Sequence, residues 1–185
     1  MNPLNYQVGE FDCGTTAFVN ALSYLLGRNG ISPSILKAVY RYTIDGFDDY
    51  GVYKGGGGTT KNGMKLLCNW INKHEKIKCA QFENEFVNKE LIEKCISNNG
   101  VVVARCYQDY EHYVTIVDID DKYVYIFDSY YLNENAYLFD KDVKVVLDKP
   151  NKYNRKVSVK RVFSQTKKDF SLGDNSFREC ILINR

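Results

Sequence analysis

The sequence is poor in proline and histidine, and neither sign of charge dominates it. Its 185 residues include 3 prolines, 13 glycines and 2 histidines, with 25 Lys and Arg against 23 Asp and Glu. The balance of charge argues against a nucleic-acid binder with a broad basic surface. A collagen-like or disordered chain is excluded because 44% of the residues are hydrophobic and 14% are aromatic. We therefore expect one globular domain over residues 1–185.

The chain also lacks the signals of membrane spans, disulfides and zinc sites. No apolar run approaches the roughly 20 residues of a transmembrane helix. The first residues show neither the basic nor the apolar part of a signal peptide, so we expect a cytoplasmic protein with free thiols. No two cysteines have C-x-x-C spacing, and only His74 and His112 could add imidazole ligands, so no metal and no organic cofactor are expected. The six cysteines are Cys13, Cys68, Cys79, Cys95, Cys106 and Cys180.

What the sequence does contain is a change of pattern near Gly100. Helical periodicity and capping residues predict helices at about 12–26, 33–42, 60–73 and 89–97. Runs of β-branched and aromatic residues predict strands at 101–103, 112–117, 123–128, 143–147, 157–163 and 180–184. Helices followed by strands predict an α+β domain with an antiparallel sheet, its helical part at about 12–98 and its β-rich part at about 100–185.

Two other segments have less specific patterns. Residues 45–58 end in four glycines, and we expect them to form a long mobile loop; a plain surface loop is favoured over a loop at a cleft edge. The glycines and the following Lys61 do not match a phosphate-binding loop, which needs glycine directly before the lysine and serine or threonine directly after it. Here Thr60 precedes Lys61 and Asn62 follows it. A basic run follows near the C-terminus, and we interpret it as a solvated strand face rather than an RNA site: Lys152, Arg155, Lys156, Lys160 and Arg161.

Cys13 stands at the expected start of the first helix, between Asp12 and Gly14. Unpaired N–H groups and a partial positive charge at a helix N-terminus stabilise a thiolate, and so make a nucleophile. The same amides can bind an oxyanion, and Gln7 offers a side-chain N–H donor a few residues upstream. A buried, unreactive thiol is the competing interpretation.

His112 and Asp128 lie on two strands that we expect to form a hairpin. If paired residue numbers sum to 240, with a loop at 119–121, His112 lies directly opposite Asp128. In that register the carboxylate orients the imidazole that activates the thiol, whereas a one-residue slip puts the two side chains on opposite faces.

With these residues in this order, the sequence resembles the papain-like bacteriocin-processing peptidases, which cleave after double-glycine leaders. The resemblance covers about residues 7–130 and rests on Gln7, Asp12-Cys13-Gly14, Ala17, His112-Tyr113-Val114 and Asp128. It implies a papain-like fold, with Cys13 as nucleophile, His112 as general base and acid, Asp128 as orienter and Gln7 as oxyanion donor.

The chain departs from that family at Ser129, where proline usually follows the aspartate, and we expect no membrane-transporter domain of the kind to which many members are fused. The leading hypothesis is a cysteine peptidase acting on a peptide or protein substrate. An acyltransferase or amidase with the same triad, and a peptide-binding module without turnover, are the alternatives. The sequence does not determine the oligomeric state.

Overall fold

The structure is a computed structural model that describes residues 3–185. Its longer helices are α1 (Cys13–Leu26), α2 (Pro33–Thr43), α3 (Lys61–His74) and α4 (Lys89–Ser97), with a short α5 (Val159–Val162) and 3₁₀ turns η1 (Arg28–Gly30) and η2 (Asn84–Phe86). Two small strands, β1 (Asp45–Phe47) and β2 (Tyr53–Gly56), form a hairpin. The main sheet contains β3 (Lys78–Glu83), β4 (Val101–Gln108), β5 (Tyr110–Ile119), β6 (Tyr123–Phe127), β7 (Val143–Val145), β8 (Arg155–Ser158) and β9 (Glu179–Asn184).

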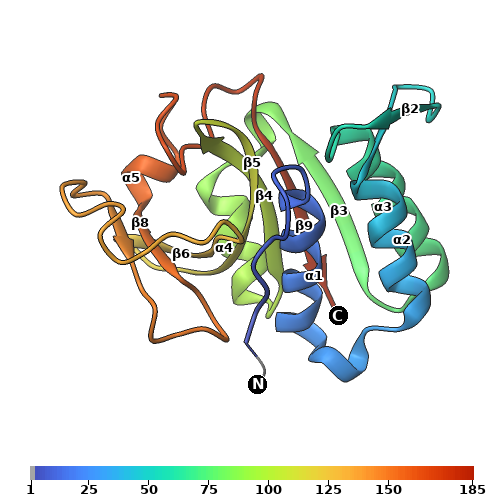
Figure 1. Ribbon diagram of the computed structural model, residues 1–185, viewed down its shortest axis with the longest axis horizontal. Helices are drawn as coiled ribbons and strands as arrows, with labels where there is room; N and C mark the ends of the chain where they lie inside the picture. Colours follow the sequence, from blue (N-terminus) through green and yellow to red (C-terminus); the bar gives the residue numbers. More distant parts are fainter. Residues whose placement is uncertain (1–2) are drawn as a thin grey trace.

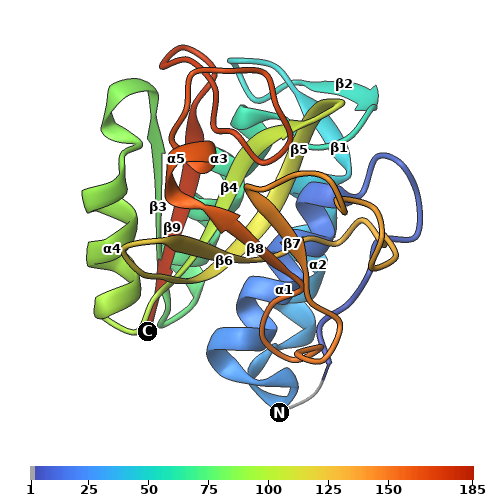
Figure 2. The same ribbon diagram turned by 90° about the vertical axis from the view of Figure 1, so that its left-hand side faces the viewer.

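The seven strands of the main sheet are ordered β3-β9-β4-β5-β6-β8-β7, and all neighbours are antiparallel. Helices α1, α2 and α3 cover one face and α4 the other (Figures 1 and 2). Two apolar cores result, one on each face of the sheet. The predicted α+β class, with N-terminal helices packed on an antiparallel sheet, is confirmed.

The helices begin where the capping residues predict. Ser32 accepts a hydrogen bond from Ile35 N–H, Thr60 from Gly63 N–H, and Asn88 from Leu91 N–H. Each such cap stabilises a helix by about 1 kcal/mol. The first helix differs, because Asp12 precedes it but makes no side-chain cap to it.

The division into a helical and a β-rich part is wrong in two places. Strand β3 lies within residues 12–98 yet pairs along its whole length with β9, at the edge of the main sheet. Residues 45–58 contain the β1–β2 hairpin rather than only a loop. The sequence does not predict β1, β2 or β3, because short or half-exposed strands have no continuous apolar pattern.

Later in the chain, two further predictions are wrong. Residues 159–162 form α5 instead of extending a strand, because Ser158 caps them through the N–H of Arg161. The basic run is not a solvated face throughout, since Arg155 and Arg161 are buried. Both arginines make ion pairs, Arg155 with Asp128 and Arg161 with two aspartates.

The β5–β6 hairpin has a register that differs from the predicted one by two residues. Ile116 pairs with Ile126, not with Val124, because the turn lies later in the sequence than expected and a bulge precedes it in β5. Asp120 fixes this turn by accepting the N–H groups of Lys122 and Tyr123. A shift by two residues leaves every side chain on its predicted face.

A bulge at Val117 is what keeps that shift even. Between the bulge and the turn, Ile119 pairs with Val124, and the paired numbers sum to 243. On the other side of the bulge, toward His112, Thr115 pairs with Phe127, and the paired numbers sum to 242. Without the extra residue the odd register would continue, and His112 and Asp128 would lie on opposite faces of the sheet. The bulge therefore brings the two side chains to one face.

Candidate active site

Cys13 is the first residue of α1 and lies almost wholly inside the molecule, with 9% of its surface exposed. The loop before it is tied to the helix, because the Asp12 carboxylate accepts the N–H groups of Val8 at 3.0 Å and Gly9 at 2.9 Å. This loop leaves the N–H groups at the start of α1 without a side-chain cap from Asp12.

The glycine-rich segment after β2 passes directly over the start of α1. A Cβ on Gly14 would lie 2.2 Å from Thr59 Oγ1, and one on Gly58 would lie 3.2 Å from the carbonyl oxygen of Phe11. Thr59 is itself held by a 2.6 Å hydrogen bond to the carbonyl of Thr43. Gly14 is therefore needed for close packing beside the thiol.

The surroundings of Cys13 favour its thiolate. Burial alone opposes ionisation, but the interaction with His112 and the backbone N–H groups of Tyr113 and Gly14 outweigh it and lower the pKa of the thiol. A lowered thiol pKa at a helix N-terminus is the property of a nucleophilic cysteine. The other five cysteines are also buried and unbridged.

His112 lies on β5 and joins Cys13 to Asp128. Its Nε2 is 2.8 Å from Asp128 Oδ1, and both side chains are buried. Burial favours the neutral ring, yet the hydrogen bonds to Asp128 and Cys13 raise the pKa of His112 to about 9. A thiol with a lowered pKa beside an imidazole with a raised one favours the thiolate–imidazolium pair.

Asp128 follows the last residue of β6 and reaches His112 diagonally, since Phe127 before it pairs with Thr115. Its carboxylate also receives the N–H of Tyr130 at 2.9 Å, Gln108 Nε2 at 3.3 Å and a guanidinium nitrogen of Arg155 at 3.4 Å. Asn154 holds the backbone of Asp128 at both its N–H and its carbonyl, at 2.8 and 2.7 Å.

Arg155, Asn154 and Gln108 were not predicted from the sequence. Asn154 directly precedes β8 and Arg155 is its first residue. Strand β8 pairs with β6, and no local sequence pattern predicts this pairing. The one available signal was the Asn154-Arg155 dipeptide opening a strand, which is too common to indicate a site.

Gln7 lies in the loop before α1 and lines the same cavity as His112. Its Oε1 accepts a 2.9 Å hydrogen bond from Ser129 Oγ, and its Nε2 donates one of its two hydrogens to the carbonyl of Gly9 at 2.8 Å. The N–H of Gln7 also donates to the carbonyl of Ser129 at 2.9 Å. Ser129 is thus the residue that fixes the side-chain amide of Gln7.

A cavity of about 400 Å³ opens beside these residues and includes Gln7 and His112 in its wall. Its other lining residues come from the loop before α1, the β4–β5 hairpin and the segment after β6, with Asp169: Glu10, Gln108, Asp109, Tyr110, Glu111, Tyr130, Leu132, Ala136 and Tyr137. The cavity contacts the histidine and not Cys13, so it adjoins the site on the side of the imidazole.

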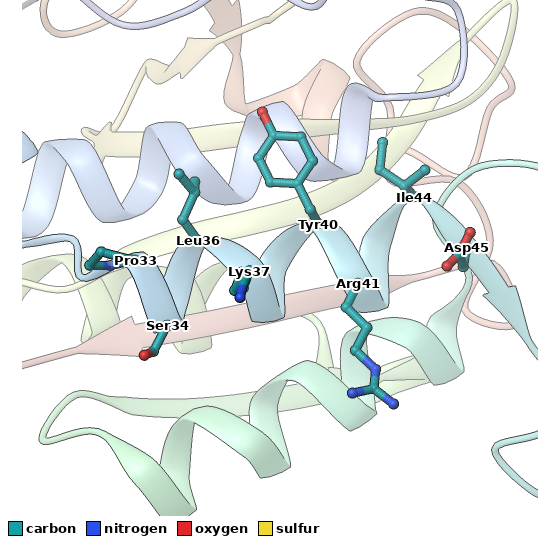
Figure 3. Close-up of a pocket in the computed structure, with 8 residues that line it drawn as sticks. All are labelled: Pro33, Ser34, Leu36, Lys37, Tyr40, Arg41, Ile44 and Asp45. Atoms are coloured by element: carbon teal, nitrogen blue, oxygen red, sulfur yellow. The ribbon is translucent and has the colours of Figure 1, made fainter.

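A larger hollow of about 780 Å³ lies on the outer face of α2, away from all four predicted site residues. Figure 3 shows Leu36 and Tyr40 standing on one side of the helix and Ser34 and Arg41 on the other. Nothing with a nucleophilic or acid–base role in the sequence analysis lines it. Of these two cavities, the one at His112 adjoins the predicted site residues.

The described part of the chain, residues 3–185, contains no group of three or more His, Cys, Asp and Glu side chains arranged to hold a metal ion. Within the same residues no helix is long and apolar enough to cross a bilayer.

Comparison with known proteins gives one informative result. No protein-family model matches the chain, and no curated protein matches its sequence. A solved structure from Bacillus anthracis, described as a "putative C39-like peptidase", aligns with a TM-score of 0.55 and 16% sequence identity, covering 99% of this chain and 94% of that one. The two proteins share their fold.

Proposed function

We propose that this chain is a papain-like cysteine peptidase. The observation that carries the proposal is the chain of contacts from Cys13, at the N-terminus of α1, through His112 to Asp128, with 2.8 Å between the last two side chains. The fold shared with the "putative C39-like peptidase" supports it. The acid–base properties of the pair support it as well, because a lowered thiol pKa and a raised imidazole pKa are what nucleophilic catalysis needs.

In the proposed reaction the Cys13 thiolate attacks the carbonyl carbon of a peptide bond, and the carbonyl π electrons move onto oxygen. The resulting oxyanion accepts hydrogen bonds from the Cys13 N–H and from the second hydrogen of Gln7 Nε2. The His112 imidazolium then gives its proton to the leaving amine as the C–N bond breaks. Neutral His112 takes a proton from water, which attacks the acyl-enzyme and releases the acid and the thiolate.

Asp128 orients His112 and stabilises its charged form throughout. Its hydrogen bond to Nε2 leaves the other ring nitrogen for the sulfur. Because the carboxylate is fully buried and held by donors on both oxygens, it has little freedom to turn away from the ring.

The finer proposal is removal of a leader peptide after a double glycine, carried by the resemblance of residues 7–130 to the bacteriocin-processing peptidases. It is tested with synthetic peptides that differ only in the two residues before the scissile bond. Preferred cleavage after Gly-Gly supports it. Equal cleavage after two bulkier residues would contradict the double-glycine specificity and leave only the proposal of a cysteine peptidase.

The test of the peptidase itself compares the parent with Cys13→Ala and, as a matched control, Cys95→Ala, which removes another buried thiol on the opposite face of the sheet. Cleavage of a peptide library should vanish in the first variant and persist in the second. Mass analysis with and without an added amine separates hydrolysis from acyl transfer. Retained cleavage in Cys13→Ala would overturn the proposal, and peptide binding without turnover in the parent would favour a binding module.

A further inference from the structure

Arg155, on β8, occupies the far side of the Asp128 carboxylate from His112. Its guanidinium is fully buried and lies 3.4 Å from Asp128 Oδ2, while His112 Nε2 lies 2.8 Å from Oδ1. The same guanidinium donates to the carbonyls of Asn154 at 2.9 Å and Tyr130 at 3.1 Å. One carboxylate is therefore shared between an imidazole and an arginine.

We infer that Arg155 is a positioning residue for the proposed reaction, the fourth member of a buried row of alternating charge: Cys13 thiolate, His112 imidazolium, Asp128 carboxylate and Arg155 guanidinium. The inference rests on the proposed function, because the row has this form only when the thiol and imidazole are charged. Its four formal charges cancel, so the site holds the ion pair without a net buried charge.

Stability alone does not explain a buried arginine at this position. Taking a guanidinium out of water costs about as much as a buried ion pair returns, so such pairs contribute little net stability. Arg155 is also incompletely satisfied, because its Nε–H has no acceptor among residues 3–185. What it supplies is a fixed positive charge next to the carboxylate that orients His112.

Other titratable groups near the row do not take over this role. Cys106 on β4 pairs across from His112, and burial raises the pKa of its thiol well above the usual value. Burial and the nearby Asp169 raise the pKa of Tyr137, so its phenol stays neutral as well. Asp169 adds a negative charge, and Gln108 on the carboxylate is uncharged. Within the described residues, Arg155 is the cation in contact with Asp128 besides His112.

Removal of this charge has a defined consequence. Without Arg155, the thiolate, imidazolium and carboxylate leave one net negative charge in the buried site. A nearby positive charge favours the deprotonated form of an acid. Removal of the Arg155 charge should therefore raise the pKa of each acid in the row. The pH at which the Cys13 thiolate forms should therefore move upward, by about one pH unit.

The experiment follows the rate of alkylation of Cys13 by iodoacetamide against pH, with the site assigned by mass spectrometry. It compares the parent with Arg155→Met, Arg155→Lys, His112→Ala and Arg178→Met. The last is a matched control, since Arg178 is another buried arginine but donates to the carbonyls of Gly173, Val87 and Phe163. Unfolding is measured for each variant, so that the rates refer to folded protein.

We expect the midpoint of the alkylation profile to rise by about one pH unit in Arg155→Met and to stay near the parental value in Arg155→Lys and Arg178→Met. An unchanged midpoint in Arg155→Met, or an equal shift in Arg178→Met, would overturn the role of Arg155. If Arg155→Met does not fold, the Arg155→Lys profile decides: a midpoint displaced as far as in His112→Ala would contradict the inference. A parent in which Cys13 shows no enhanced reactivity would instead contradict the proposed function.

Discussion

Ser129 Oγ donates a 2.9 Å hydrogen bond to Gln7 Oε1, which joins the proposed oxyanion donor to the residue directly after Asp128. The backbone of Gln7 donates to the carbonyl of Ser129 in parallel, also at 2.9 Å. Ser129, which stands where the peptidases that the sequence resembles usually have proline, therefore has a definite contact. It fixes the amide of Gln7 so that Nε2 faces away from Ser129.

Replacement of Ser129 should weaken the oxyanion site without changing the thiol. We expect kcat/KM of Ser129→Ala to fall about tenfold, less than the ~100-fold or greater loss expected for Gln7→Ala. Because Ser129 acts through Gln7, the double variant should be no slower than Gln7→Ala. An additional tenfold loss in the double variant would show that Ser129 acts by another route.

The substitution Gly14→Ala tests the close packing at the start of α1. A Cβ there would lie 2.2 Å from Thr59 Oγ1, so Gly14→Ala must displace Thr59 and its hydrogen bond to Thr43. We expect a loss of about 1–3 kcal/mol in the free energy of unfolding, measured in urea. Gly57→Ala is the matched control, because its Cβ would meet nothing within 4 Å. Equal stability of the two variants would contradict the packing described for Gly14.

The pH dependence of stability should reveal the ion pair. The folded pair of Cys13 thiolate and His112 imidazolium binds one proton, as does the unfolded pair of neutral thiol and neutral imidazole. Parental stability should therefore gain almost no pH dependence from this pair at about pH 7 to 8, between the unfolded pKa values of histidine and cysteine.

Cys13→Ala should behave differently, because His112 remains next to Asp128 and its pKa stays above the unfolded value. The stabilisation from its charge is complete below pH 6.5 and is lost as pH rises toward the folded pKa, at most about 1.4 kcal/mol per pH unit. Urea unfolding of both proteins at several pH values gives the difference. A difference that does not change between pH 6.5 and 9 would show that His112 is not charged in the folded state.

Asp128→Asn should reduce activity less than Cys13→Ala or His112→Ala, because the amide oxygen can still accept the His112 N–H. Its stability should fall by about 3–5 kcal/mol, because the buried guanidinium of Arg155 loses its countercharge. The double variant Asp128→Asn with Arg155→Met should recover part of that loss, as thermal unfolding can measure. Strict additivity of the two changes would mean that the two side chains do not interact.

The sequence was sufficient to predict the four longer helices and the faces of the central hairpin. Ser32, Thr60 and Asn88 mark helix starts by local hydrogen bonds, and such signals need no knowledge of the rest of the fold. Val114 and Ile116 lie in one core and Tyr113 in the other, as the alternation predicted. Cys13 and Gln7 also occupy positions that short-range reasoning can find.

The register and the supporting residues could not be obtained in this way. The position of the Asp120 turn and the bulge at Val117 depend on side-chain packing across strands, and together they displace the pairing by two residues. Strand β3 depends on β9, about a hundred residues later. Arg155 contacts Asp128 through β8, whose place beside β6 no local pattern indicates.

The pH profile of Cys13 alkylation, in the parent and in His112→Ala, shows whether Cys13 and His112 form a thiolate–imidazolium pair. We expect Cys13 of the parent to react well below the usual thiol pKa, ahead of Cys68 and Cys180, and we expect His112→Ala to remove this advantage. Alkylation of Cys13 no faster than of Cys68 or Cys180, or an unchanged profile without His112, would contradict it.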